Sequence, residues 1–264
     1  MVAASKMRKA QQAAIEAQAF ARLLYRIQRS AVTHAPGFMH PLLEVREVTR
    51  QAVILVAADK GLCGALNTNV FRVASQFDPR TTVFITAGRR AAQFVARTRR
   101  QLAAEFAYGD TPSFAEARAI AGLARTLFVT GDVDQVSIVA TRFVNTLTQA
   151  PVAIEFLPVS AITTLQIPGV EPERRSDDDV PVETVYEPDS ETVLAYLLDR
   201  YLNILTYIVL LNAKASEQSA RMVSMKNATD SADTLIADLT LEYNKLRQGN
   251  ITRELLEIAG GQAE

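Results

Sequence analysis

Residue types that build disulfides and metal sites are scarce in this 264-residue sequence, which has one cysteine, two histidines and no tryptophan. The single cysteine, Cys63, excludes a disulfide within the chain and a zinc site built on cysteines, and it is typical of a reducing compartment. Both histidines, His34 and His40, lie in the segment HAPGFMH, whose proline and glycine argue against a preformed metal site. The start of the chain has no apolar core of the kind found in signal peptides. We therefore expect no cofactor and no metal.

Proline is also absent from residues 189–259, where the only glycine is Gly249. A helix over this whole segment would be about 100 Å long, at a rise of roughly 1.5 Å per residue. Such a length is typical of a coiled coil, a membrane span or a helical repeat. The candidate span at 193–211 contains Asp199 and Arg200 near its centre, and each charge there would cost roughly 2.5–3.5 kcal/mol on insertion. We therefore reject a membrane span.

The apolar residues of this segment recur at alternating steps of three and four, as in the seam of a left-handed coiled coil. The seam consists of Met222, Met225, Thr229, Ala232, Ile236, Leu239, Tyr243 and Leu246. The start of the chain repeats the step with smaller side chains, at Ala3, Met7, Ala10, Ala14, Ala17, Ala21 and Leu24. Small side chains let a second backbone approach closely. The pattern predicts a two-helix coiled coil made from both ends of the chain, and the alternative is an alanine-rich helix that packs on the domain instead.

The middle of the chain alternates between short apolar runs and helical segments. Expected strands cover residues 51–58, 81–86, 135–144 and 152–158, and expected helices cover 69–77, 113–128 and a segment that begins at Arg89. The run at 51–58, QAVILVAA, is unbroken, as in a strand that is buried on both faces. Ser113 with Glu116 three residues later forms a capping box. The alternation predicts a small open α/β sheet with Rossmann-like layering.

The segment at 166–188 is rich in proline and carries the charge run ERRSDDD, which is typical of an exposed loop or linker. The chain is therefore expected to have four parts. These are an N-terminal shaft helix at 1–35, an α/β foot domain at 48–165, an exposed loop or linker at 166–188 and a C-terminal shaft helix at 189–259.

A glycine turn, DKGLCG at 59–64, follows the first expected strand. Such a turn can hold phosphate on its backbone N–H groups, but it lacks the G-x-x-x-x-G-K-[ST] and G-x-G-x-x-G patterns. The alternative is that the glycines only permit a tight turn. Cys63 has no histidine near it in the sequence that would make it a nucleophile. The sequence therefore shows no catalytic constellation.

The net charge is −1, but charge is unevenly distributed along the chain. Residues 1–30 are basic, with six lysines and arginines and one acidic residue, Glu16. A basic helix suits nucleic acid, anionic lipid or an acidic protein collar, or it is only a solvated face. One alternative function is therefore a nucleic-acid-binding adaptor with a Rossmann-like domain, although the basic residues are not interleaved with aromatic ones. A nucleotide-dependent enzyme would need the phosphate loop that the sequence lacks.

Separated segments of the chain carry a resemblance to a known family. They are MVAASKMRKAQ, DKGLCGALNTN, RFVNTLTQAP, VYEPDSE and, within the long helical segment, SEQSARMVSMKNATDSAD and YNKLRQGNITRELLEI. In this order they resemble the gamma subunit of F-type ATP synthases over nearly the whole chain. The resemblance implies an antiparallel coiled coil of the two terminal helices with an α/β domain at its foot.

The resemblance also implies a function without catalysis. In that family the coiled coil is the central shaft inside a ring of alternating alpha and beta subunits, and the foot joins the epsilon subunit and the membrane ring of c subunits. Proton or sodium flow turns the shaft, which takes each beta site through different affinities for ADP, phosphate and ATP. The implied location is the cytoplasmic side of a bacterial cell membrane, as a peripheral protein.

Contacts with the ring of subunits are implied by position. Arg247 and Gln248, in NKLRQGNIT, match an Arg-Gln pair that binds a loop of a beta subunit, where a guanidinium can pair with a carboxylate. Thr252 and Glu254 match nearby polar contacts. Without the resemblance, Arg247 and Glu254 would be ordinary solvated helix charges.

The start of the chain departs from the family pattern. Met1 matches a methionine that faces the long helix near Arg221, and family members begin before the MVAASK motif with a basic stretch of the same helix. We therefore expect this chain to be short at its start. No inserted cysteine pair is present in the middle, which argues against the light-regulated chloroplast form.

Overall fold

The computed structural model describes residues 7–9, 12–13, 16, 38–159, 187 and 189–260. The chain divides into two compact units, Met1–Met222 and Val223–Glu264. This division lies inside the last helix rather than at its start. The four-part division at 1–35, 48–165, 166–188 and 189–259 stays a prediction.

A five-stranded sheet forms the centre of the first unit. Its strands are β1 (Gln51–Val56), β2 (Thr82–Ala87), β3 (Gln101–Phe106), β4 (Gln135–Phe143) and β5 (Gln149–Leu157). Their spatial order is β3-β2-β1-β4-β5, in which β1 to β4 run parallel and β5 runs antiparallel to β4. The order 3-2-1-4 is that of the first four strands of a doubly wound sheet, so the predicted Rossmann-like layering is confirmed.

Strand β3 was not expected from the sequence. Its residues, QLAAEF, are mostly exposed because β3 is an edge strand, whereas β1 at the centre of the sheet is almost completely buried. An exposed edge strand needs no continuous apolar run, and that run was the signal for the other strands. Each of the four expected strands is present within a few residues of its expected bounds.

Within residues 38–159, three helices accompany the sheet, α2 (Leu66–Ala74), α3 (Arg89–Arg97) and α4 (Phe114–Val129), and the 3-10 turn η1 (Pro41–Leu43) precedes it. Helix α2 begins three residues before its expected start at Asn69. The capping box that begins α4 is confirmed, because Ser113 Oγ accepts from the Glu116 backbone N–H and the Glu116 carboxylate accepts from the Ser113 backbone N–H.

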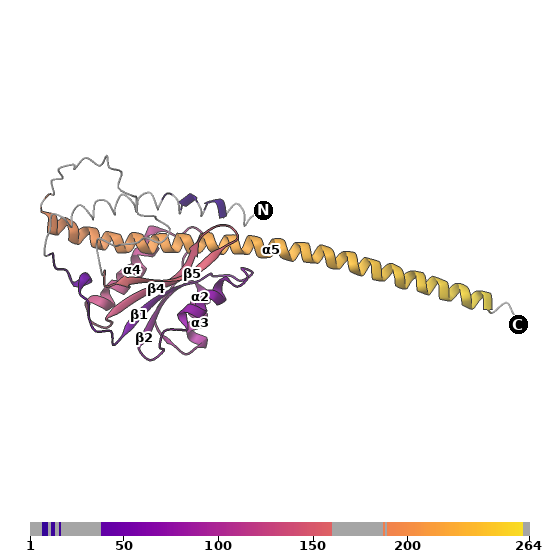
Figure 1. Ribbon diagram of the computed structural model, residues 1–264, viewed down its shortest axis with the longest axis horizontal. Helices are drawn as coiled ribbons and strands as arrows, with labels where there is room; N and C mark the ends of the chain where they lie inside the picture. The colour runs from indigo at the N-terminus through magenta and orange to yellow at the C-terminus, as the bar shows by residue number, and fades with distance from the viewer. Residues whose placement is uncertain are drawn as a thin grey trace. The chain divides into compact units, whose positions relative to one another are not determined.

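Apolar side chains cover both faces of the sheet. Helices α2 and α3 pack on one face, against Val53, Leu55 and Phe84, while α4 and the first part of α5 pack on the other, against Ile54 and Ile85 (Figure 1). Residues of β1 thus alternate between two cores, which explains why its apolar run is unbroken. We call this sheet with α2, α3 and α4, at residues 38–159, the sheet domain.

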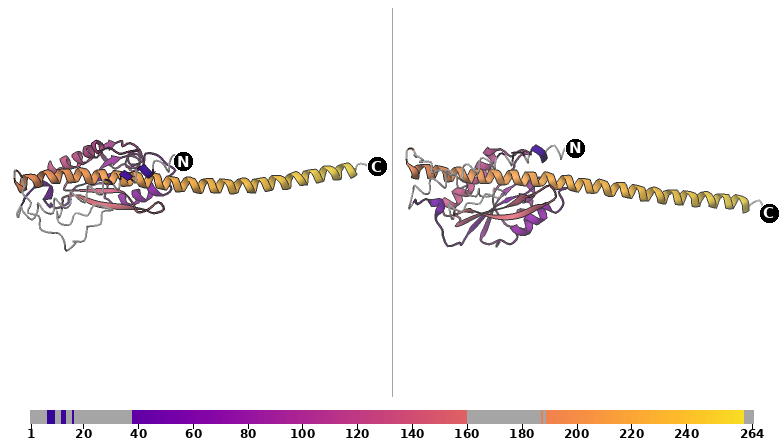
Figure 2. Two further views of the ribbon diagram at one scale, coloured as in Figure 1. Left: turned by 90° about the horizontal axis from the view of Figure 1, so that it is seen from above. Right: turned by 45° about the horizontal axis from the view of Figure 1, so that its top comes forward.

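Helix α5 (Ser190–Gly260) is a single helix of 71 residues. Its first part lies beside α4 (Figure 2), where Arg125 Nη1 is 2.7 Å from Asp199 Oδ1. Residues 208–221 are buried without interruption. An 18-residue window of α5 is apolar and long enough to cross a membrane, but 61% of that window is buried inside the structure. Such burial is what a core helix shows, and core helices satisfy the same length and hydropathy criteria.

The second unit, considered by itself, is helical from Val223 to Gly260. The predicted seam residues are exposed there, and Leu239 is 55% exposed. The other large apolar side chains with more than two fifths of their surface exposed in this part of α5 are Met225, Leu235, Ile236, Leu241, Tyr243, Leu246, Ile251, Leu255, Leu256 and Ile258. The seam thus consists of apolar side chains that are typical of a buried surface, but in this structure they are exposed to solvent.

The expected partner helix at the start of the chain lies almost wholly outside the described residues. Residues 7–9, 12–13 and 16 are helical, as the pattern predicts. The coiled-coil pairing of the two ends and the loop at 166–188 depend on residues outside the described ranges. Within the described part of the chain, the fold is that of the α/β sheet with a long C-terminal helix that the sequence predicts.

Candidate functional site

The carboxyl edge of the sheet is where doubly wound folds place their ligands, at the point between β1 and β4 where the strand order reverses. In this chain the loop at 57–64 leaves β1 at that edge, and the first unit's part of α5 contacts it. The two segments are brought together from positions 160 residues apart in the sequence. The candidate site is therefore the junction of α5 with this loop.

The loop after β1 has a tight conformation and is tied by hydrogen bonds to the first turns of α2 and α3. Leu62 and Gly64 have positive φ angles, 61° and 58°, and the side chain of Leu62 is exposed. Asn67 Oδ1 accepts from the Ala58 backbone N–H at 3.1 Å. Asp59 Oδ1 accepts from the Arg89 backbone N–H at 3.0 Å, so a carboxylate of this chain already satisfies the first N–H of α3.

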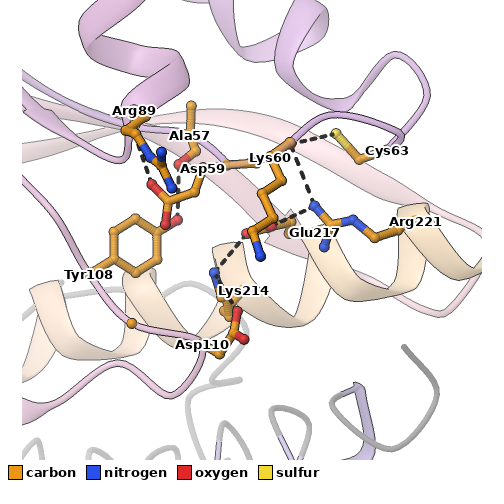
Figure 3. Close-up of polar contacts among 12 residues, drawn as sticks. Ala57, Asp59, Lys60, Cys63, Arg89, Tyr108, Asp110, Lys214, Glu217 and Arg221 are labelled. Atoms are coloured by element: carbon orange, nitrogen blue, oxygen red, sulfur yellow. Dashed lines mark hydrogen bonds and ion pairs between the residues drawn. The ribbon is translucent and has the colours of Figure 1, made fainter. Parts of the chain in front are cut away.

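Three charged side chains of α5 form a ladder along this loop, and Glu217 is its central member (Figure 3). The Glu217 carboxylate lies 3.0 Å from Lys214 Nζ and 2.7 Å from Arg221 Nη2. The Glu217 side chain is 2% exposed and the Lys214 side chain is 1% exposed. A buried carboxylate that bridges two cations is compensated on both sides, which is what burial of such charges requires. We call Lys214, Glu217 and Arg221 the α5 ladder.

Each cation of the α5 ladder also reaches a different loop of the sheet domain (Figure 3). Arg221 donates to the backbone carbonyl oxygens of Lys60 and Gly61, at 3.5 Å and 3.4 Å. Lys214 Nζ lies 3.5 Å from Asp110 Oδ1 and 5.1 Å from the ring centroid of Tyr108, in the loop that follows β3. The ladder therefore ties α5 to two loops at the carboxyl edge.

The two reactive side chains beside the ladder are held in their neutral forms. Burial, together with the charges of Glu217, Asp59 and Glu116, raises the pKa of Tyr108 well above its ordinary value. The Tyr108 hydroxyl donates to the carbonyl oxygen of Ala57 at 3.0 Å. Burial also raises the pKa of the Cys63 thiol, and the nearby Arg221 only partly opposes this. A neutral thiol and a neutral phenol are poor nucleophiles, so these raised pKa values disfavour nucleophilic attack by Cys63 and Tyr108.

No cluster of three or more histidine, cysteine, aspartate and glutamate side chains suited to a metal ion occurs among the residues that the structure describes. The charged side chains at the junction form ion pairs with one another. The interactions observed at this edge are ion pairs and hydrogen bonds.

The residues expected to contact partners fall into different parts of the chain. Arg221 belongs to the α5 ladder. The others in the described chain, Arg247, Gln248, Thr252 and Glu254, are exposed on the second unit's part of α5, where Thr252 Oγ1 donates to the Gln248 carbonyl oxygen at 2.9 Å. Met1 lies outside the described residues. Their contacts with other subunits stay predictions.

Lys214 and Glu217 were missed as candidates. The signal was in the sequence, because Lys214, Glu217 and Arg221 are spaced three and four apart and therefore lie on one face of the helix. Their burial was not readable from the sequence, because charged residues at this spacing usually form an exposed face.

The full sequence matches a protein family described as ATP synthase, over residues 1–263. It is 43% identical over 267 residues to the ATP synthase gamma chain of Opitutus terrae, a match that covers 99% of this chain and 90% of the relative. The chain belongs to the ATP synthase gamma family. Another member, the ATP synthase gamma chain of Dehalococcoides mccartyi strain CBDB1, is 39% identical over 269 residues, covering 100% of this chain and 90% of that relative.

Solved structures show the same fold at lower identity. A chain of the Tetrahymena thermophila mitochondrial ATP synthase central stalk and c-ring superimposes with a TM-score of 0.63 at 24% identity, covering 87% of this chain and 96% of that one. A chain of the Euglena gracilis mitochondrial ATP synthase, from a structure of its OSCP, F1 and c-ring, gives a TM-score of 0.62 at 16% identity, covering 99% and 92%. A sheet domain with a long C-terminal helix is therefore the fold of this family.

Proposed function

We propose that this chain is the rotor of an F-type ATP synthase, the gamma subunit of its central stalk. The observation that carries the proposal is membership of the gamma family over residues 1–263, with relatives named ATP synthase gamma chain that are matched over 90% of their own length. Solved structures with this fold belong to ATP synthases and support the same assignment.

The rotor function requires geometry rather than a catalytic group. Proton or sodium flow through a membrane ring of c subunits turns the sheet domain, and the helical shaft turns inside a ring of alternating alpha and beta subunits. The shaft presents different side chains at different angles, so its contacts favour a different conformation of each beta subunit at each angle. ATP synthesis or hydrolysis takes place on the ring, and this chain couples it to ion flow.

The partners of the chain in this assembly are the alpha and beta subunits, the epsilon subunit and the c-ring. Its location is the cytoplasmic side of a bacterial cell membrane, where it is a peripheral protein that reaches the membrane through the c-ring. The exposed apolar side chains between Met225 and Ile258 support such partners, because a large exposed apolar surface marks a protein interaction site.

Four exposed polar residues of α5 are assigned to the ring of alpha and beta subunits. Arg247 and Gln248 bind a loop of a beta subunit, and Thr252 and Glu254 lie within the next two turns of the same helix. Arg247 is suited to this role because its planar guanidinium forms paired hydrogen bonds with a carboxylate. Met1 and Arg221 complete the set of expected contacts.

Substitution of Arg247 tests this assignment. In the reconstituted complex, Arg247→Ala is expected to lower coupled ATP hydrolysis and ATP-driven ion pumping, because a charge-assisted contact with the ring is lost. The matched control is Arg253→Ala, since Arg253 is also exposed on α5 and has no assigned partner. Equal turnover in the wild type and Arg247→Ala would contradict the assigned contact.

A further inference from the structure

Most of the first part of α5 is held by apolar packing. Leu194, Leu198, Leu205 and Ile208 are fully buried in the core that α5 shares with the sheet and α4. Apolar burial is non-directional and scales with area, so it holds the helix on the sheet more firmly than it fixes the helix at one angle about its own axis. Hydrogen bonds and ion pairs depend steeply on geometry and do fix such an angle.

The α5 ladder supplies directional contacts to two separate loops. Arg221 holds the carbonyl oxygens of Lys60 and Gly61 after β1, and Lys214 holds Asp110 after β3. The two cations are seven residues apart, which places them about 10 Å apart along the helix axis. Rotation of α5 by even part of a turn would separate both contacts at once.

Burial makes the α5 ladder costly to disrupt. Rotation of α5 leaves Glu217 paired with both cations, because all three residues lie on α5. It separates Lys214, whose side chain is 1% exposed, from Asp110, and a buried cation that loses a partner is poorly compensated by water. By contrast, the ion pair of Arg125 with Asp199 also joins α5 to the sheet domain, but its side chains are 36% and 47% exposed. Water replaces such a surface pair at little cost.

We propose that Glu217, together with Lys214 and Arg221, is a torsional lock that fixes the angle of α5 about its own axis relative to the sheet domain. The inference rests on the proposed function, in which torque must pass between the sheet domain and the shaft. Glu217 is then a positioning residue of the rotor, because it acts by holding its two cations against the two loops.

The test uses the complex with its alpha and beta subunits, carrying a probe on the sheet domain. With the ring stalled by a non-hydrolysable ATP analogue, the angular distribution of the probe reports how freely the sheet domain turns about the held shaft. Glu217→Gln, which keeps the side-chain shape and removes the charge, is expected to widen this distribution. Asp199→Asn, which breaks the exposed ion pair on the same helix, is expected to leave it unchanged.

A covalent link can replace the lock. Cys63 and Ala220 pack in one small buried cluster with Ala58 and Leu66, beside the α5 ladder. In Glu217→Gln with Ala220→Cys, copper phenanthroline with oxygen takes two electrons and two protons from the thiols of residues 63 and 220 and forms one S–S bond. Oxidation is expected to narrow the angular distribution again, and dithiothreitol is expected to reverse the effect.

Lys214→Met serves as a second variant, because it leaves Glu217 paired with Arg221 and is predicted to widen the distribution in the same direction. The lock is overturned if the probe has the wild-type angular distribution in both Glu217→Gln and Lys214→Met. It is also overturned if the distribution is wider in Glu217→Gln and the formed disulfide does not narrow it again. A wild-type chain that assembles with no alpha and beta subunits overturns the proposed function instead, so the two failures are distinguishable.

Discussion

Arg221 donates to the carbonyl oxygen of Gly61 at 3.4 Å, across 160 residues of sequence. The contact uses the planar fork of the guanidinium, which also pairs with Glu217 at 2.7 Å. Arg221→Lys keeps the charge but has no fork, so we expect it to lose the loop contacts and about 1–2 kcal/mol of the free energy of unfolding. The urea midpoint of the full-length chain measures this. Arg253→Lys, at an exposed position, is the control, and an equal midpoint for both variants would contradict the account.

Gly88 is required by the backbone between β2 and α3. Its φ is 95°, and a Cβ atom there would lie 2.1 Å from the carbonyl oxygen of Ala57. We expect Gly88→Ala to lower the free energy of unfolding by about 1–3 kcal/mol from backbone strain, with a further loss from the clash. Gly131→Ala separates the two effects, because Gly131 also has a positive φ, 81°, but nothing lies within 4 Å of its Cβ position. A loss no larger at Gly88 than at Gly131 would argue against the clash.

Asp134 gives the stability of the sheet domain a defined pH dependence. Hydrogen bonds from the Arg50 backbone N–H and from the hydroxyl and N–H of Thr49 hold the pKa of Asp134 below its ordinary value. A carboxyl with a lowered pKa in the folded state stabilises the fold above its unfolded pKa of about 3.9, and this is lost as the pH falls through the folded pKa. We therefore expect the wild type to have a higher urea midpoint than Asp134→Asn. This difference is expected to be largest near neutral pH and to become smaller below about pH 4.

The cause of that pH dependence can be tested separately. Thr49→Val removes one donor to the Asp134 carboxylate without changing the charge. We expect this variant to show a weaker loss of stability on acidification than the wild type. A pH dependence as steep as that of the wild type would show that the Thr49 hydroxyl contributes nothing.

The apolar seam of the second unit predicts the behaviour of the isolated chain. Ile236, Leu239 and Tyr243 are each more than half exposed. Surfaces of this kind associate in water, so we expect the isolated chain to self-associate with increasing concentration. Leu239→Glu is predicted to reduce this association in sedimentation experiments, and Asp238→Glu, at the neighbouring position outside the seam, is predicted to leave it unchanged. The idea fails if Leu239→Glu associates as strongly as the wild type.

Sequence patterns predicted the parts of the fold that depend on local signals. The buried strand β1 has an unbroken apolar run, α4 has its capping box, and α5 lacks proline throughout. Edge strand β3 escaped detection because its exposed residues need no apolar pattern. Contacts between residues far apart in the sequence were also not predicted, since no local sequence pattern indicates that Arg221 donates to the carbonyl oxygen of Gly61.

Sequence motifs indicated the function, but they predicted only part of the candidate site. The segments DKGLCGALNTN and SEQSAR each contributed to the resemblance, but their contact depends on how the sheet packs against α5. Lys214 and Glu217 have the spacing of an ordinary exposed helix face, and tertiary packing makes them buried. Burial of a charge is a property of the whole fold, so a single sequence does not reveal it.

Rotation is the most direct test of the central claim that this chain is a rotor. The full-length chain would be combined with the alpha and beta subunits of the same organism, the ring fixed to a surface, and a probe attached to the sheet domain. On addition of ATP, we predict that one chain is held per ring and that the probe turns continuously in one direction. A ring that hydrolyses ATP with the chain bound and the probe stationary would contradict the account.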